Sequence, residues 1–300
     1  MTVSDAQYRE LTNVRVSEPD AVAKALASRR RRAELTRNGM LFIVAADHAA
    51  RGMIGVGADP RAMADRRVLL ERLLTALEHP RVDGVLGSAD ILEDLVLLGA
   101  LDDRVAVGTM NRGGLAGATW ELDDRFTAYD VDHLVGANLD AGKMLLRIDG
   151  SDPGTVATLE GCARAVQALT DRRMLAMVEP IPYTKDGAGR AVGDDDPLQL
   201  LRAVGVSAAL GGSSAYTWLK IQATADIDAV AAMTTQPLLL LGGAPGPDPE
   251  ATFAAWERAL GEPTVRGLVV GRALLYPPDG DVAAAVGRAA DLVTQTAGRR

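Results

Sequence analysis

The feature of this sequence that most restricts its fold is an alternation, from residue 41 onward, of short apolar runs with longer amphipathic segments. Eight runs have the length and composition of buried strands: 41–47, 82–87, 104–109, 143–149, 174–181, 217–223, 237–242 and 266–271. Four intervening segments have helical spacing of apolar residues: 60–79, 155–170, 197–210 and 249–260. Eight strands alternating with helices favour an α/β fold, a (β/α)8 TIM barrel, over a doubly wound sheet.

The length of 300 residues suits one barrel of roughly 250 residues plus an extension. We predict a barrel over 41–300 and an N-terminal helical extension over 1–40. A helix in the extension is expected to start at Pro19 and to include the arginines at 29–32. Because arginine favours helices and no aromatic residue interrupts this run, we interpret it as a solvated helix face rather than an anion site.

The connection between residues 112 and 140 is the segment that fits the alternation least. Trp120, Phe126 and Tyr129 lie in it without a regular spacing. We expect a long irregular loop, and such loops in compact domains are often functional.

Composition limits where the protein acts and what it binds. The chain is 48% hydrophobic and 24% charged with a mean hydropathy of +0.06, which is typical of an ordered globular protein. No apolar run reaches about 18 residues and the N-terminus is polar, so we expect a cytoplasmic protein without a membrane span. A net charge of −8 argues against nucleic-acid binding. Barrels usually associate, so a homo-oligomer is expected.

Cysteine and histidine give no sign of a metal centre. The single Cys162 excludes an intramolecular disulfide. His48, His79 and His133 are scattered and form no H-E-x-x-H motif or Cys/His cluster. The sequence therefore favours chemistry that needs neither a metal nor a cofactor.

Lysine is rare in this chain, which makes its positions informative. The 32 basic residues include only Lys24, Lys143, Lys185 and Lys220. Lys220 lies within the apolar run 217–223 and shares a face with Trp218 and Gln222. A buried lysine has a lowered pKa and can present a neutral, nucleophilic amine for Schiff-base chemistry, which arginine cannot do. The alternative is an exposed lysine on an edge strand.

Two other strands carry a carboxylate at or near their C-terminal ends, where a barrel builds its site. Asp47 follows the first run on the same face as Ile43 and Ala45, although it could instead cap the next helix. Glu179 is a lone carboxylate in the apolar run 174–181. We expect burial to raise its pKa towards neutrality, which suits an acid/base. Tyr183 is a second candidate acid, or only a packing residue.

The fourth strand and the last two add further candidates. Lys143, Arg147 and Asp149 share one face of the fourth strand, which suits a polar barrel centre or a structural ion pair between Arg147 and Asp149. The seventh and eighth strands lead into the segments 241–246 and 269–272. Candidate phosphate-binding residues there are Gly242, Gly243, Gly271 and Arg272.

These residues together resemble the class I, Schiff-base aldolase superfamily of deoxyribose-phosphate, tagatose-bisphosphate and archaeal-type fructose-bisphosphate aldolases. The resemblance spans about residues 41–275 and rests on the segment Trp-Leu-Lys-Ile at 218–221. It implies that Lys220 forms the Schiff base. It also implies roles for Asp47, Lys143 and Glu179, which match in kind and position an acid, a lysine and a glutamate of the tagatose-bisphosphate branch.

The sequence departs from these families in places. The segment Ala-Ala-Asp-His-Ala-Ala-Arg-Gly at 45–52 differs from the tagatose enzyme's loop, and Arg147 stands where other branches differ. No second lysine lies on the seventh strand, which disfavours deoxyribose-phosphate aldolase. A weaker resemblance is to aldolase-like barrel proteins of actinobacterial inositol-catabolism clusters, which would imply 2-deoxy-5-keto-gluconate 6-phosphate as substrate.

The leading hypothesis is reversible retro-aldol cleavage of that compound or of a ketohexose bisphosphate. Two alternatives stay open. One is an acyl-transferring, thiolase-like member of the same superfamily, which also uses a lysine. The other is a non-catalytic barrel that binds a sugar phosphate, although binding alone needs neither a desolvated amine nor a buried acid.

Overall fold

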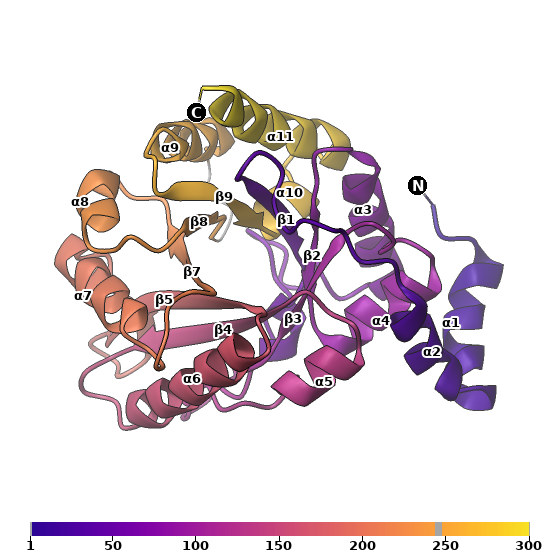
Figure 1. Cartoon of the computed structure of the whole chain (residues 1–300), viewed down its shortest axis with the longest axis horizontal. Helices are drawn as coiled ribbons and strands as arrows, with labels where there is room; N and C mark the ends of the chain where they lie inside the picture. Colours follow the sequence, from indigo (N-terminus) through magenta and orange to yellow (C-terminus); the bar gives the residue numbers. More distant parts are fainter. Residues whose placement is uncertain (1, 244–247, 300) are drawn as a thin grey trace.

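Eight parallel strands close into a barrel surrounded by helices, which confirms the predicted TIM-barrel fold (Figure 1). The computed structural model describes residues 2–243 and 248–299. The barrel strands are β1 (Leu41–Ala45), β2 (Gly84–Gly87), β3 (Val105–Thr109), β4 (Ala141–Ile148), β5 (Leu175–Lys185), β7 (Thr217–Gln222), β8 (Leu238–Leu241) and β9 (Val265–Val270). Each overlaps one of the eight apolar runs identified in the sequence.

The barrel closes between β1 and β9 and between β4 and β5. Ile43 of β1 pairs with both Gly84 of β2 and Val269 of β9, and Gly142 of β4 pairs with Ala176 of β5. Residues alternate along each strand between the barrel interior and the helix-facing side. A small cluster including Ile43 lies inside the barrel, whereas the larger cluster packs between strands and helices. Burial on both sides explains why the strands read as continuous apolar runs.

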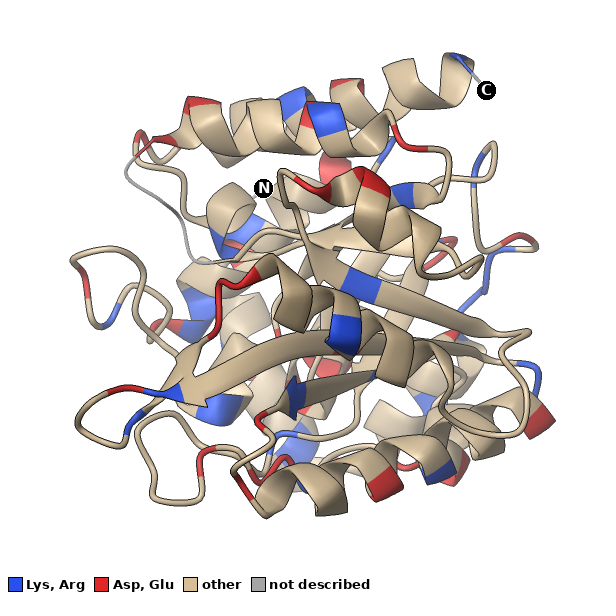
Figure 2. Ribbon diagram, turned by 90° about the vertical axis from the view of Figure 1, so that its left-hand side faces the viewer, with Lys and Arg blue, Asp and Glu red and all other residues tan. Residues whose placement is uncertain are grey.

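The outer ring contains α3 (Arg66–Glu78), α4 (Ala89–Leu97), α5 (Val131–Gly136), α6 (Gly154–Asp171), α7 (Pro197–Ala208), α8 (Ile227–Ala232), α9 (Pro249–Leu260) and α11 (Val282–Gly298) (Figure 1). Two single-turn helices, η1 (His48–Arg51) and α10 (Arg272–Leu275), follow β1 and β9. The helix expected from residue 60 begins at Arg66, because the Asp65 carboxylate accepts the Val68 N–H and caps it there. Acidic and basic positions are interspersed along the helices and loops (Figure 2). Within the two described ranges, no helix is long and apolar enough to cross a membrane.

Two helices precede the barrel, α1 (Asp5–Ser17) and α2 (Asp20–Ser28), and they lie outside the ring against α4 (Figure 1). The prediction that the arginines at 29–32 form a solvated helix face is wrong. The helix ends at Ser28, and the four arginines bind carboxylates at the N-terminal end of the barrel. The arginine run passes across the N-terminal ends of the barrel strands. Its ion pairs there outweigh the helix propensity of arginine.

Two buried aspartates anchor this arginine segment to the barrel. Asp83, just before β2, pairs with Arg32 at 2.6 Å and accepts the Phe42 N–H at 2.7 Å. Asp140, just before β4, pairs with Arg29 at 2.9 Å and accepts the Ala106 N–H at 2.8 Å. The segment therefore covers the barrel end opposite the strand C-termini.

Strand β5 extends beyond the barrel and turns back into β6 (Ala191–Gly193), an antiparallel strand that the sequence analysis did not identify. Pro180 and Pro182 lie in this extended strand. They are tolerated because β7 pairs only with Ala176–Val178, so the later part of β5 has β4 as its neighbour in the barrel sheet.

The connection over 112–140, which we expected to be irregular, contains some regular structure: a β-bridge at Phe126 and a short helix. Asn111 forms a β-bridge with Phe126, and its side-chain amide bonds both the N–H and the C=O of Leu145 on β4. The short helix α5 occupies Val131–Gly136. The remaining loop, residues 112–126, lies at the C-terminal end of the barrel.

Candidate active site

A cavity of about 130 Å³ lies at the C-terminal ends of the strands, and most of the residues predicted for the site line it. The predicted residues that line it are Asp47, Glu179, Tyr183, Lys220, Gly242, Gly243, Gly271 and Arg272. Lys143 contacts this group from the barrel interior, whereas Arg147 does not line the cavity. Ala244, Pro245 and Gly246, part of the expected phosphate segment, lie outside the described residues.

The pair formed by Lys220 and Glu179 is at the centre of the cavity. Lys220 Nζ donates to Glu179 Oε1 at 2.6 Å, and the side chains are only 6% and 8% exposed. Strand alternation places both residues inward, on neighbouring strands β5 and β7. The reading of Lys220 as an exposed edge-strand lysine is therefore wrong, because β7 has a strand on each side.

Burial lowers the pKa of Lys220, an effect that the neighbouring Glu179 carboxylate opposes and that Arg112 and Arg272 reinforce. Burial also lowers the pKa of Lys143 well below its usual value, with the Arg112 charge adding to the effect. Both amines therefore lose a proton more readily than a solvated lysine.

The ionisation of Glu179 differs from the sequence-based expectation. Burial acts to raise its pKa, but the positive charges of Lys143, Lys220 and Arg112 together hold it well below its ordinary range. Glu179 therefore stays ionised while these cations surround it. An ionised carboxylate accepts a proton, so the geometry suits Glu179 as a base that becomes an acid only after it has taken up a proton.

Asp47 completes a charged cluster on the other side of Glu179. Its carboxylate pairs with Arg112 and lies 3.5 Å from Lys143 Nζ, which in turn pairs with Glu179 Oε2. Asp47 stands at the start of η1 without accepting a capping hydrogen bond from it, so helix capping does not explain its side chain. Three cations, Lys143, Lys220 and Arg112, thus face two carboxylates.

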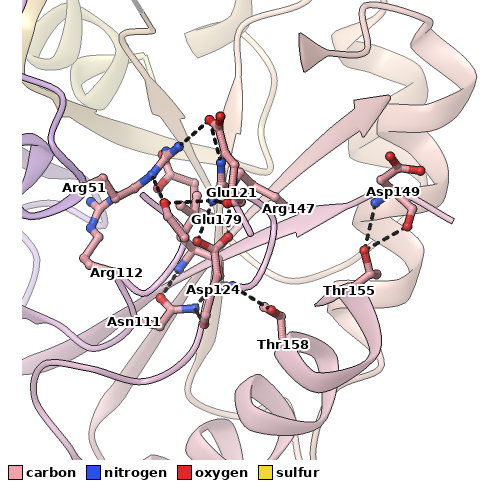
Figure 3. Close-up of polar contacts among 12 residues, drawn as sticks. Arg51, Asn111, Arg112, Glu121, Asp124, Arg147, Asp149, Thr155, Thr158 and Glu179 are labelled. Atoms are coloured by element: carbon pink, nitrogen blue, oxygen red, sulfur yellow. Dashed lines mark hydrogen bonds and ion pairs between the residues drawn. The ribbon is translucent and has the colours of Figure 1, made fainter. Parts of the chain in front are cut away.

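Arg147 organises the loop over the site instead of facing the cavity. Its guanidinium donates twice to Asp124, both at 2.8 Å, and also to the Gly114 C=O at 3.1 Å (Figure 3). The alternative of a structural ion pair between Arg147 and Asp149 is wrong, because Arg147 pairs with Asp124. Asp149 lies apart from this cluster, where its backbone exchanges hydrogen bonds with Thr155 (Figure 3).

Tyr183 connects this loop cluster to the cavity. Its ring lies against the Arg147 guanidinium, with 5.2 Å from the guanidinium carbon to the ring centroid. The contact is a cation–π arrangement in a partly desolvated setting. Tyr183 is therefore positioned at the cavity wall by the same arginine that holds the loop.

The end of the cavity next to β8 and β9 contains the cations Arg51 and Arg272, and the backbone packs closely there. A Cβ at Gly271 would come within 2.5 Å of the His48 ring and 2.3 Å of the Ala45 carbonyl, so glycine is required there. Gly243 has a φ of +63°, which also favours glycine. Burial lowers the pKa of Arg272, and the adjacent Arg51 charge lowers it further.

His48 lines the same end as a neutral imidazole. Burial, followed by the charge of Arg272, lowers its pKa to about 3. Its Nδ1 is buried without a hydrogen-bond partner in the described part of the chain. The ring can therefore exchange a hydrogen bond with a bound molecule without carrying a charge.

Sequence reasoning missed several residues of the site: His48, Arg51, Arg112, Glu121 and Asp124. Arg112 follows β3 in the same way that Asp47 follows β1, so the rule that strand C-termini build the site would have found it. Asp124 and Glu121 gave no such signal, since their positions depend on how loop 112–126 folds back. Among described residues, His, Cys, Asp and Glu form no group of three or more placed to hold a metal ion.

Comparison with known proteins shows the family. Residues 39–290 match the Cgl0159-like family. The chain belongs to this family. The crystal structure of Cgl0159 from Corynebacterium glutamicum is 48% identical, superposes with a TM-score of 0.94, and the match covers 98% of each chain. The family name states no reaction.

More distant structures share the fold. An archaeal fructose-1,6-bisphosphate aldolase with its catalytic lysine bound to the carbinolamine intermediate is 19% identical, with a TM-score of 0.64 over 91% of this chain and 99% of that one. A fructose-bisphosphate aldolase from Slackia heliotrinireducens is 16% identical, with a TM-score of 0.58 over 98% and 94%. Among curated proteins, none matches the chain. The chain thus shares the fold of these fructose-bisphosphate aldolases.

Proposed function

We propose that this protein is a class I aldolase that reversibly cleaves a phosphorylated keto sugar through a Schiff base on Lys220. The observation that carries the proposal is a buried lysine amine with a lowered pKa, 2.6 Å from an ionised carboxylate, at the C-terminal end of a barrel. The shared fold with an aldolase whose catalytic lysine binds a carbinolamine supports this reading.

The steps follow from the charges around Lys220. The neutral amine adds to the keto carbon, and the carbinolamine then takes up one proton from solvent and loses water to give a protonated imine. Glu179 then takes the proton of the hydroxyl group on the β-carbon, which is the second carbon from the imine carbon. The carbon–carbon bond breaks, its electrons form an enamine, and an aldehyde leaves. Protonation of the enamine by Glu179 and hydrolysis release the ketone and restore Lys220.

Other residues of the cavity have supporting roles in this proposal. Lys143 and Arg112 keep Glu179 ionised until it accepts the proton. Asp47, paired with Arg112, is placed to bind a substrate hydroxyl. Arg272 and Arg51, with the glycines beside them, form the end where a phosphate binds. The candidate substrates are 2-deoxy-5-keto-gluconate 6-phosphate and a ketohexose bisphosphate.

The experiment that tests the proposal is borohydride trapping followed by intact-mass measurement. Incubation with a keto sugar phosphate and borohydride should add the mass of the reduced ketone to the protein, and peptide mapping should place it on Lys220. Lys220→Arg should keep the fold and lose both the adduct and turnover, because a guanidinium does not deprotonate to attack a carbonyl. Lys185→Arg, on the exposed hairpin, serves as the control and should keep both.

Cleavage by Lys220→Arg at a rate near that of the wild type would contradict the Schiff-base mechanism. Acyl-thioester products would favour the acyl-transfer alternative. Saturable binding of sugar phosphates without an adduct or turnover would favour the alternative of a non-catalytic barrel that binds a sugar phosphate.

A further inference from the structure

The cations of the cavity differ in whether a carboxylate already neutralises them. Arg112 pairs with Asp47, Lys220 and Lys143 pair with Glu179, and Arg51 lies 3.5 Å from Glu121. Arg272 is the cation lining the cavity for which the described residues supply no ion pair, and its Nε is buried without a hydrogen-bond partner. A half-buried guanidinium whose Nε is buried without a partner is costly unless a ligand neutralises it.

This unpaired charge lies close to the amine that attacks the substrate. Arg272 lines the same cavity as Lys220 and its charge contributes to lowering the pKa of Lys220. The cavity of about 130 Å³ is small compared with the roughly 300–1,000 Å³ of sites that enclose a drug-sized ligand. A phosphate at Arg272 therefore belongs to the ketone half of the substrate.

The opposite side of the cavity offers no comparable charge. Arg147 is neutralised by Asp124 and further contacted by Glu121 at 3.4 Å (Figure 3). Outside Glu121 lies a second cavity, of about 480 Å³, whose basic residues Lys185 and Arg190 are already paired with Asp152 and Asp186. Among the described residues, each of the three cations on the Tyr183 side of the cavity, Arg147, Lys185 and Arg190, is therefore already paired with a carboxylate.

Resting on the proposed aldolase function, we infer that the substrate carries one phosphate, on the ketone side of the cleaved bond, and no second phosphate on the aldehyde side. Arg272 and Arg51 bind the ketone-side phosphate. Glu121 and Asp124 disfavour a second dianion beyond Tyr183 through like-charge repulsion.

The test separates this inference from the aldolase proposal. Dihydroxyacetone phosphate, which contains a ketone and one phosphate, is first trapped on the protein with borohydride. Failure to form this adduct on Lys220 would contradict the proposed function itself. Where the adduct forms, kcat/KM for aldol addition is compared between glyceraldehyde and glyceraldehyde 3-phosphate as acceptors. In this direction the enamine carbon bonds to the aldehyde carbon, and the aldehyde oxygen takes a proton from protonated Glu179.

We expect kcat/KM to be at least about 10-fold higher for glyceraldehyde, the acceptor without a phosphate, which corresponds to about 1.4 kcal/mol. Equal or higher kcat/KM for glyceraldehyde 3-phosphate would overturn the inference. Glu121→Gln removes the carboxylate that lies 3.5 Å from Arg51 and 3.4 Å from Arg147, and it should narrow the preference at least about three-fold. Glu160→Gln, which removes an exposed carboxylate on α6, is the matched control and should leave the preference unchanged. A preference that Glu121→Gln leaves unaltered would also count against the charge-based explanation.

Discussion

At the scale of single residues, the site works by setting protonation states through burial and neighbouring charge. Glu179 shows the balance most clearly. Burial alone would make it a neutral acid, yet three cations keep it ionised. Each lysine that contacts it has a lowered pKa, so the cluster can hold a carboxylate base beside a neutral amine. In water at neutral pH the glutamate would also be ionised, but the lysines would stay protonated.

Glu179→Gln should separate imine formation from carbon–carbon cleavage. It keeps the shape of the side chain but removes the base, so kcat should fall by about 10²–10⁴-fold while the imine on Lys220 is still trapped. Glu179 raises the pKa of Lys220 against the effect of burial. Its removal should therefore lower that pKa, and the pH at which trapping becomes half-maximal should move down.

The measurement is the rate of borohydride-trapped adduct as a function of pH, alongside steady-state turnover. Asp152→Asn, in the neighbouring cavity, is a suitable control. A trapping profile that moves to higher pH would show that Glu179 does not support the charged form of Lys220.

Arg272→Ala should mainly weaken substrate binding. In the proposed complex the guanidinium contacts the substrate phosphate, which takes no part in bond breaking, so its loss removes a charge-assisted contact of about 1.5–3 kcal/mol. KM should rise accordingly while kcat is partly retained, because that contact is similar in the ground and transition states. Steady-state kinetics with a phosphorylated and an unphosphorylated ketone distinguish the roles. Loss of kcat with unchanged KM would assign Arg272 to the chemical step.

At the scale of elements, loop 112–126 is held over the barrel by two buried arginines, Arg147 on β4 and Arg51 on η1, which both donate to the Gly114 carbonyl. Arg147 on β4 bonds Asp124 and the Gly114 carbonyl, and a Cβ at Gly114 would lie 2.2 Å from its Nη2. The same guanidinium lies against Tyr183 on β5. Loop 112–126 and the part of β5 that carries Tyr183 therefore both contact one side chain of β4.

Asp124→Asn should loosen this loop while the barrel stays folded. Removing one partner of a buried ion pair costs about 3–5 kcal/mol when the other charge remains buried, and Glu121 offsets part of that cost. Amide hydrogen exchange over 113–122 should accelerate by at least about 10-fold, with little change in β1–β4. Asp123→Asn removes the adjacent acid, whose partner Arg125 is 75% exposed, and should have little effect. Uniform acceleration in all strands would instead indicate global destabilisation.

At the scale of the whole molecule, the two ends of the barrel differ in structure. The arginine segment 29–32 and its aspartates stabilise the N-terminal end, whereas the cavity lies at the C-terminal end. Leu35 packs against the interior cluster from the same side as the arginines. Residues before β1 thus contribute to stability on the face away from the cavity.

Asp83→Asn should destabilise the fold without a direct effect on the site. Asp83 is fully buried and pairs with Arg32 and Arg81, each at 2.6 Å. Leaving these arginines without their carboxylate should lower the free energy of unfolding by about 3–5 kcal/mol, measured by denaturant titration. KM and kcat at low temperature should stay near wild-type values. Asp228→Asn, at an exposed position on α8, should change stability by less than about 0.5 kcal/mol.

The sequence by itself determined the barrel and the inward residues of its strands. The alternation of eight apolar runs with helical segments indicated eight parallel strands. The alternating direction of side chains along a strand placed Lys143, Glu179 and Lys220 on inward faces, because strand geometry is local. It did not determine the arginine segment, since ion pairs with Asp83 and Asp140 override helix propensity there.

Only the tertiary structure decided which charges meet. Asp124 rather than Asp149 neutralises Arg147, because loop 112–126 folds back over β4. Glu179 is ionised rather than neutral, because the positive charges of Lys143 on β4 and of Arg112, which follows β3, lower its pKa. Arg272 lacks a carboxylate among the described residues although other cations of the cavity have one. The distances between charges depend on barrel closure, and the pKa of each group depends on those distances.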